Sequence, residues 1–174
     1  MKALQFCSPL LIAFMLSFLH PVLNSSWPYS DEFVKFLNTS EKIWIYNSTE
    51  KSKVRCKVDV MTSIDSEDYY FNRTIYWDDD RNTTTELLAA LFEEVSLVGP
   101  RYSGTNTTEY LLYQNDNSTC SVYRVSFPYE RGWYELRLRD SLLTQGPTVD
   151  CQEFFSNRTQ KYNQTNFTGC GYIL

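Results

Sequence analysis

Two runs of alternating hydrophobic and polar positions lie between Cys120 and Cys151. The first alternating run places four residues on one face: Ser121, Tyr123, Val125 and Phe127. The second run sets three apolar residues against three charged ones: Tyr134, Leu136 and Leu138 against Glu135, Arg137 and Arg139. A short turn containing Gly132 separates the two runs, which is the pattern of a β-hairpin.

Four further segments have the alternation or composition of strands. They are Lys42–Tyr46, Lys53–Val60, Tyr69–Trp77 and Glu109–Gln114. In the second of these, four apolar residues (Val54, Cys56, Val58, Val60) alternate with four charged ones (Lys53, Arg55, Lys57, Asp59). That pattern predicts one buried face and one face in water.

The segment Tyr69–Trp77 predicts more than a strand. Asn72 begins an Asn-x-Thr sequon, and a glycan there must face solvent. Side chains alternate across a strand, so the inner face would carry Tyr69, Phe71, Arg73, Ile75 and Trp77. An unpaired buried charge is costly, so either Arg73 pairs with an interior carboxylate or it is held for an anionic ligand.

Two helical pieces and one ambiguous segment complete the pattern. Trp27–Leu37 and Asp150–Phe155 have the features of short helices. The apolar residues of Thr84–Val95 are spaced as in a helix, but the remaining architecture favours a strand, which is our prediction. About eight short strands then form an all-β, antiparallel barrel that can hold one small ligand. We find no internal boundary and expect one domain over 27–174.

Residues 1–26 have the character of a signal peptide, with an apolar stretch too short to span a bilayer and small residues at Ser25 and Ser26. We therefore expect a secreted, extracellular protein. Residues 1–26 hold one of the 16 basic and none of the 21 acidic residues, so the remaining chain has a formal charge of −6. This charge argues against nucleic acid or an anionic membrane as partner, and we expect a monomer.

Cysteine and asparagine usage agrees with secretion. Four cysteines remain after Cys7 leaves with the leader, and their number alone allows three pairings. Many sequons in one chain predict a glycosylated surface. The sequon asparagines are Asn24, which falls in the leader, and Asn38, Asn47, Asn72, Asn82, Asn106, Asn117, Asn157, Asn163 and Asn166.

Catalysis and metal binding find little support in the sequence. The single histidine, His20, lies in the expected leader, which removes histidine-based catalytic triads and histidine metal ligands. The acidic run Asp78–Asp80 lacks the glycine and spacing of a calcium loop and predicts a solvated turn. We expect no enzyme activity, no metal and no cofactor.

The residues also resemble a known family, the tick salivary lipocalins of the histamine-binding type. The similarity covers essentially the whole chain after the leader. The features that carry it are Trp27, Asp31 and Phe33 at the start, Cys56 in an alternating strand, Cys120-Ser121-Val122, Glu135-Leu136, Cys151 after Pro147, and Cys170. The resemblance implies an eight-stranded barrel, the pairings Cys56–Cys170 and Cys120–Cys151, and capture of histamine, serotonin or leukotriene-like lipids from a host.

The chain departs from the amine-binding motif of that family at two positions. Ser121 stands at an aspartate position and Arg137 at an aromatic position, while Glu135 is retained. A guanidinium ~7 Å from a ligand ammonium, at an effective dielectric of about 20, costs about 2.4 kcal/mol. These changes, with Arg73, favour an anionic lipid over an amine. Alternatively, Glu135, Arg137 and Arg139 form a solvated strand face.

The leading hypothesis is therefore a secreted salivary lipocalin that sequesters a small host inflammatory mediator. The expected ligand-binding residues are Phe71, Arg73, Trp77, Ser121, Tyr123, Glu135 and Arg137. The alternative is a glycosylated protein that binds and inhibits host defence proteins of complement or haemostasis through its loops.

Overall fold

The computed structural model describes most of the chain after its first 33 residues. The described residues are 34–51, 53–64, 68–77, 83–92, 96–100, 106–166 and 170. The expected leader, the opening residues Trp27, Asp31 and Phe33, and the run Asp78–Asp80 lie outside them, as do Asn24 and Asn82. None of the helices in this part of the chain is long and apolar enough to cross a membrane.

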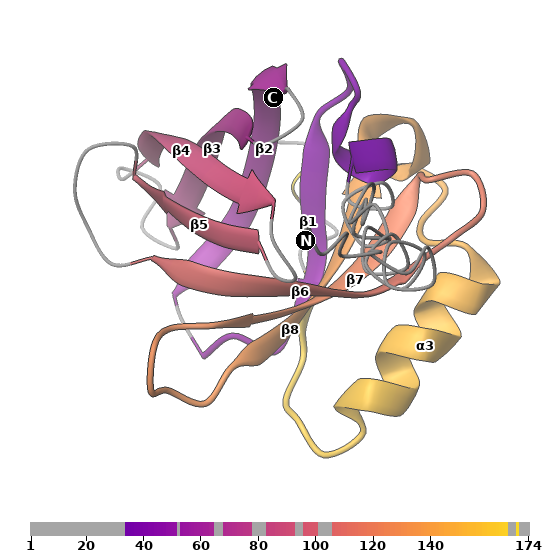
Figure 1. Cartoon of the computed structure of the whole chain (residues 1–174). Helices are drawn as coiled ribbons and strands as arrows, with labels where there is room; N and C mark the ends of the chain where they lie inside the picture. Colours follow the sequence, from indigo (N-terminus) through magenta and orange to yellow (C-terminus); the bar gives the residue numbers. More distant parts are fainter. Residues whose placement is uncertain are drawn as a thin grey trace, which may run out of the picture.

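Eight antiparallel strands form a closed barrel (Figure 1). They are β1 (Ile43–Ser48), β2 (Val54–Ile64), β3 (Asp68–Trp77), β4 (Thr83–Phe92), β5 (Ser96–Pro100), β6 (Thr107–Gln114), β7 (Cys120–Ser126) and β8 (Trp133–Arg139). Neighbours in sequence pair from β2 to β8, and β1 closes the ring by pairing with both β8 and β2. The short strand β9 (Thr165–Asn166) adds to β1.

The sequence predicts a strand over Thr84–Val95 against its helical spacing, and β4 confirms it as far as Phe92; residues 93–95 lie outside the described part. Strand β4 lies between β3 and β5 and pairs with both. The barrel therefore supplies backbone partners on both sides, and the pairing overrides a local pattern that favours a helix. Leu88 and Ala90 of this strand are buried, whereas Leu87 faces outward and is 37% exposed.

The predicted hairpin is confirmed as β7–β8, and both of its faces are buried. Tyr123 pairs with Glu135 and Ser121 with Arg137, and these four side chains point into the barrel. The other face lies beneath helix α3 (Val149–Thr159), seen beside β7 and β8 in Figure 1. The residues that α3 covers include Val122, Leu136 and Leu138, which contact Cys151 and Phe155.

Both pairings implied by the family resemblance are present. Cys56–Cys170 ties β2 to the end of the chain, and Cys120–Cys151 ties β7 to α3. A 3₁₀ turn, η1 (Asp140–Leu142), leads from β8 toward α3, and the Trp44 indole donates a hydrogen bond to Asp140 (2.6 Å).

The prediction for the charged face of Lys53–Val60 is wrong in part. Lys53 and Arg55 are exposed as expected, but Lys57 and Asp59 are 5% and 3% exposed and lie inside the barrel. Val60, expected in the core, is on the outer face opposite Asn72 and is 38% exposed. A register shift between Val54 and Cys56 precedes Lys57 and Asp59, and these two residues face inward, where Glu135 and Arg73 supply oppositely charged partners.

The two ends of the barrel differ. Residues 34–37 form a helical turn whose Phe36 and Leu37 pack into the core with Tyr123. The Arg139 guanidinium donates to the Phe36 carbonyl (3.0 Å), which holds this turn over one end. The main cavity lies at the opposite end, where its lining includes Trp77 at the end of β3, Pro100 at the end of β5 and Trp133 at the start of β8.

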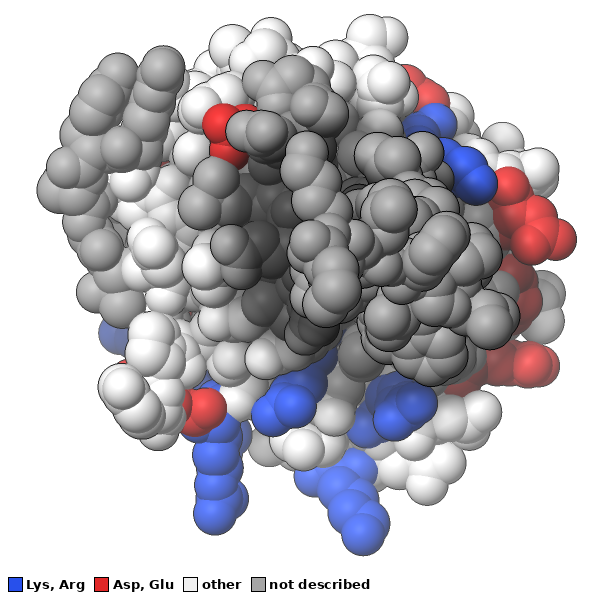
Figure 2. Space-filling model, viewed as in Figure 1, with Lys and Arg blue, Asp and Glu red and all other residues white. Residues whose placement is uncertain are grey.

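The surface carries both signs of charge and several sequons. On the face shown in Figure 2, basic side chains gather along the lower edge and acidic ones along the right edge. The sequon asparagines that are exposed are Asn38, Asn72, Asn106, Asn117, Asn157 and Asn163. Asn47 differs from them, since it is 5% exposed and its amide donates to the Gln164 side chain (3.3 Å). The side chain of Asn166 lies outside the described part.

Candidate functional site

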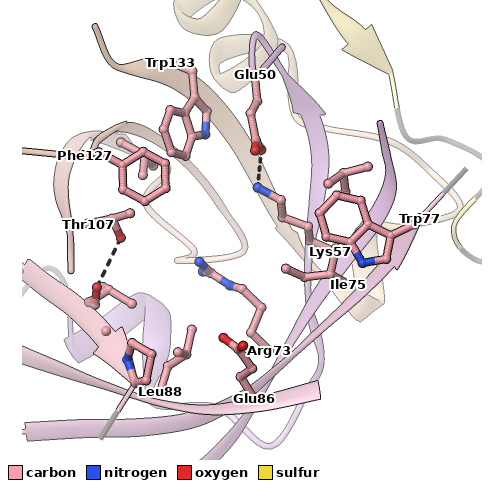
Figure 3. A pocket seen from close by; sticks show the side chains of 15 residues that line it. Glu50, Lys57, Arg73, Ile75, Trp77, Glu86, Leu88, Thr107, Phe127 and Trp133 are labelled. Carbon is pink, nitrogen blue, oxygen red and sulfur yellow. Dashed lines mark hydrogen bonds and ion pairs between the residues drawn. The ribbon is translucent and has the colours of Figure 1, made fainter. Parts of the chain in front are cut away.

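A cavity of about 430 Å³ occupies one end of the barrel, and we call it the main cavity (Figure 3). Its size lies in the lower part of the range of roughly 300–1,000 Å³ that is typical of small-molecule sites. Its apolar wall comes from Val54, Ile75, Trp77, Leu88, Val98, Pro100, Val125, Phe127 and Trp133. The polar side chains on it are Glu50, Lys57, Arg73, Glu86 and Thr107.

The aromatic part of the wall is made by three strand ends. Trp77 ends β3, Trp133 begins β8, and Phe127 follows β7. The rings of Phe127 and Trp133 contact each other with centroids 5.5 Å apart, and Figure 3 shows them above the cavity with Trp77 across from them. Flat or elongated apolar ligands would stack against such a wall.

Six charged residues lie in and beneath the lining of the main cavity, and we call them the interior ion network; five are buried, and the Arg73 side chain is 11% exposed. They are Lys57, Asp59, Arg73, Glu109, Glu135 and Arg137. The network contains three cations and three carboxylates, so its members balance in charge. Glu50 extends it toward the mouth of the cavity through an ion pair with Lys57.

Arg73 has the carboxylate partner that the sequence left open. Its Nε and Nη2 both donate to Asp59, each at 2.7 Å, and Nη1 lies 3.4 Å from Glu109. A two-point contact of this kind is among the stronger ion pairs in proteins. Asp59 and Glu109 hold the pKa of Arg73 above its ordinary value despite the opposing effect of burial.

Arg137 lies at the centre of the network. It donates to Glu109 (2.6 Å) and to Glu135 (2.5 Å), and its guanidinium covers the Tyr123 ring at 4.2 Å. Burial would raise the pKa of both glutamates, but Arg137 lowers it below the ordinary value in each case. The alternative of a solvated Glu135–Arg137 face is therefore wrong, since these residues are 1% and 2% exposed.

The network divides the expected site residues into groups. Arg73 and Trp77 contact the main cavity, whereas Glu135 and Arg137 form the floor beneath it. Phe71 and Tyr123 lie beyond that floor in the core, beside a space of only about 10 Å³. Ser121 is buried there as well.

Several cavity residues were not expected from the sequence. Lys57 was assigned to a face in water, and Glu50, Glu86 and Trp133 had no assigned role. The inward direction of Lys57 and Asp59 could have been predicted from their partners on β3, because paired residues on adjacent strands point to the same face of the sheet. Asp59 pairs with Arg73 across β2–β3, so one inward arginine fixes the direction of both.

The arginines therefore do not present free positive charge to a ligand. Each is paired with buried carboxylates, and the acidic Glu50 and Glu86 also line the main cavity. The expectation of an anionic ligand depended on uncompensated arginines at these positions, and the structure removes that basis. Among the described residues, no group of three histidine, cysteine or acidic side chains could hold a metal.

Comparisons with known proteins place the fold. The structure is similar to that of AM182 in its serotonin complex, with a TM-score of 0.61 and 16% identity over 78% of this chain and 88% of that one. The chain has the lipocalin fold.

Two further lipocalin structures agree. Japanin from Rhipicephalus appendiculatus bound to cholesterol matches with a TM-score of 0.55 and 9% identity, over 75% of this chain and 93% of that one. The bovine lipocalin allergen Bos d 2 matches with a TM-score of 0.51 and 16% identity, over 74% and 91%. No protein-family model and no curated protein matches the sequence. At these identities the similarity extends to the fold.

Proposed function

We propose that this protein is a secreted, glycosylated lipocalin that sequesters a small, uncharged and largely apolar host mediator in the main cavity. The observation that carries the proposal is an aromatic cavity of about 430 Å³ above a floor of fully paired charges. Binding is stoichiometric and involves no turnover. Two disulfides and six exposed sequon asparagines support secretion.

The paired floor disfavours charged ligands of either sign. The lining carboxylate of Glu86 is exposed to water, where an ion pair contributes little. A carboxylate ligand would need Arg73 or Lys57 as its partner, and a buried ammonium would need Glu50 or Glu135. Each of these groups already has a partner, and breaking a buried ion pair costs several kcal/mol. Uncharged ligands leave every pair intact and gain from burial against Trp77, Phe127 and Trp133.

The ligands bound in two of the similar structures differ in charge, which bears on the choice of ligand. AM182 was solved with serotonin, which carries an amine, and Japanin with cholesterol, which is uncharged. Of these two kinds of ligand, the paired charges of this chain support the uncharged one, and the cavity volume supports a compact molecule. The amine and the leukotriene-like acid implied by the family resemblance become comparison ligands in the test.

Calorimetric titration with three indoles of similar size tests the proposal. They are 3-methylindole (neutral), tryptamine (cationic) and indole-3-acetate (anionic), with histamine, a leukotriene and cholesterol titrated alongside. We expect 3-methylindole to bind at least tenfold more tightly than either charged indole, which corresponds to about 1.4 kcal/mol. Tighter binding of a charged indole would overturn the ligand class. Failure of every compound, with no small molecule extracted from the secreted protein, would overturn sequestration.

A further inference from the structure

The Lys57 ammonium occupies a compact site in the wall of the main cavity. Its Nζ forms an ion pair with Glu50 and lies 3.3 Å from Glu135 Oε1. It also lies 5.6 Å from the centre of the Trp133 ring. Figure 3 shows the Lys57 side chain directed at Glu50, with Trp133 on the same side of the cavity.

The three groups around Nζ are those that bind a ligand ammonium. Two carboxylates accept charge-assisted hydrogen bonds, and an aromatic face within about 6 Å attracts a cation. The site is also fixed in place, because the Trp133 indole donates to Glu135 Oε1 at 2.9 Å. Glu135 is further held by Arg137 on its other oxygen.

We infer that Lys57 is a built-in cation that fills an ammonium-binding site, and that it thereby excludes primary amines from the main cavity. Glu50, Glu135 and Trp133 form this site, and Lys57 reaches it from β2. Lys57 is a specificity-determining residue, which goes beyond the proposed function because it assigns the exclusion of amines to one side chain. Replacement of Lys57 by an apolar residue of similar length would open the site to a free amine.

A free amine competes poorly with Lys57 for two reasons. The lysine is tethered, so its effective concentration at the site is on the order of millimolar or higher. An amine that displaced it would leave the Lys57 ammonium buried without a partner, since the side chain is 6% exposed. Loss of a buried partner is expensive enough to weaken amine binding by roughly a hundredfold or more.

The test compares the ratio of tryptamine affinity to 3-methylindole affinity in four proteins by titration calorimetry. In Lys57→Met we expect this ratio to rise at least tenfold over that of the unmodified protein. Lys53, an exposed lysine four residues before Lys57, provides the matched control: Lys53→Met should leave the ratio unchanged. Adding Glu50→Gln to Lys57→Met should remove most of the gain, because one of the two acceptors is lost. An unchanged ratio in Lys57→Met would overturn the inference.

A second measurement needs no variant. Limited acetylation of the folded protein, followed by mass spectrometry, should modify Lys57 at least tenfold more slowly than the exposed Lys51. Equal rates would show that Lys57 does not occupy the site and would also overturn the inference. Neither outcome depends on which ligand the unmodified protein prefers. The 3-methylindole affinity tests the proposed function, while the tryptamine gain and the acetylation rates test the role of Lys57.

Discussion

Replacing Arg137 by methionine tests whether the interior ion network is as buried as its contacts indicate. Arg137 is 2% exposed and holds two carboxylates at once, Glu109 at 2.6 Å and Glu135 at 2.5 Å. After the substitution Glu135 retains Lys57 and Trp133, whereas among the described residues Glu109 retains only the longer contact with Arg73 (3.4 Å). The larger part of the loss should therefore come from Glu109.

The unfolding free energy should fall by about 3–5 kcal/mol, the usual cost of removing one partner of a buried ion pair. Single domains are stable by about 5–15 kcal/mol in total. For a domain of this size, each kcal/mol lowers the melting temperature by about 2–4 °C, so the shift should be about 6–20 °C. Urea unfolding monitored by tryptophan fluorescence gives the free energy, and thermal melts give the midpoint.

Two comparisons isolate the cause of this loss. Arg124 is on β7 and exposed, so Arg124→Met should cost under about 1 kcal/mol. Adding Glu109→Gln to Arg137→Met should recover part of the stability, because the orphaned carboxylate is neutralised. A cost under 1 kcal/mol for Arg137→Met would refute the reasoning, since Arg137 would then behave as a surface charge.

Three further predictions follow from particular contacts. The cations beside Glu109 and Glu135 outweigh burial and lower the pKa of both carboxyls. The stability that these carboxylates contribute is therefore present at neutral pH and is lost as the pH falls below the ordinary pKa of 4.5. Unfolding free energies measured from pH 7 to 3 should decline in that range, and Glu109→Gln should make the decline less steep. Removal of the Cys56–Cys170 bridge, which closes 114 residues, should cost about 1 kcal/mol more than removal of the bridge across 31 residues, and urea unfolding of the two double-alanine variants would measure the difference. Glycopeptide mapping of the secreted protein should find Asn47 without a glycan because that side chain is buried, and high occupancy would contradict the packing of β1.

Much of the fold could be predicted from the sequence because the alternation of apolar and polar residues within a short segment shows which side of a strand faces the core. The hairpin β7–β8 follows directly from alternation, and β3 follows from alternation together with the outward requirement of the Asn72 sequon. Strand β4 could not be decided in this way, since its spacing is helical and its conformation depends on partners in β3 and β5. Pairing across a barrel is a long-range property that no short window contains.

The site could be predicted less completely, for a reason specific to this interior. Alternation assigns a charged face to water, and that rule fails for Lys57 and Asp59 because Glu135 and Arg73 neutralise them. Those partners come from strands distant in sequence, so their proximity appears only once the barrel is closed. The family resemblance supplied the disulfides and the barrel, but it could not show that Arg137 is balanced by Glu109.

The position of the ion network also explains why shape, rather than charge, should select the ligand. Arg73 and Asp59 on β3 and β2 connect through Glu109 on β6 to Arg137 on β8, so the network spans the barrel from one wall to the other. The interior ion network therefore separates the aromatic core around Phe71 from the main cavity. Each charged group of the network is paired with another, so a ligand that bound one of them would break an ion pair between strands. Apart from Thr107 and the exposed Glu86, the groups that remain for recognition are the aromatic and aliphatic side chains of the cavity wall, which discriminate by fit.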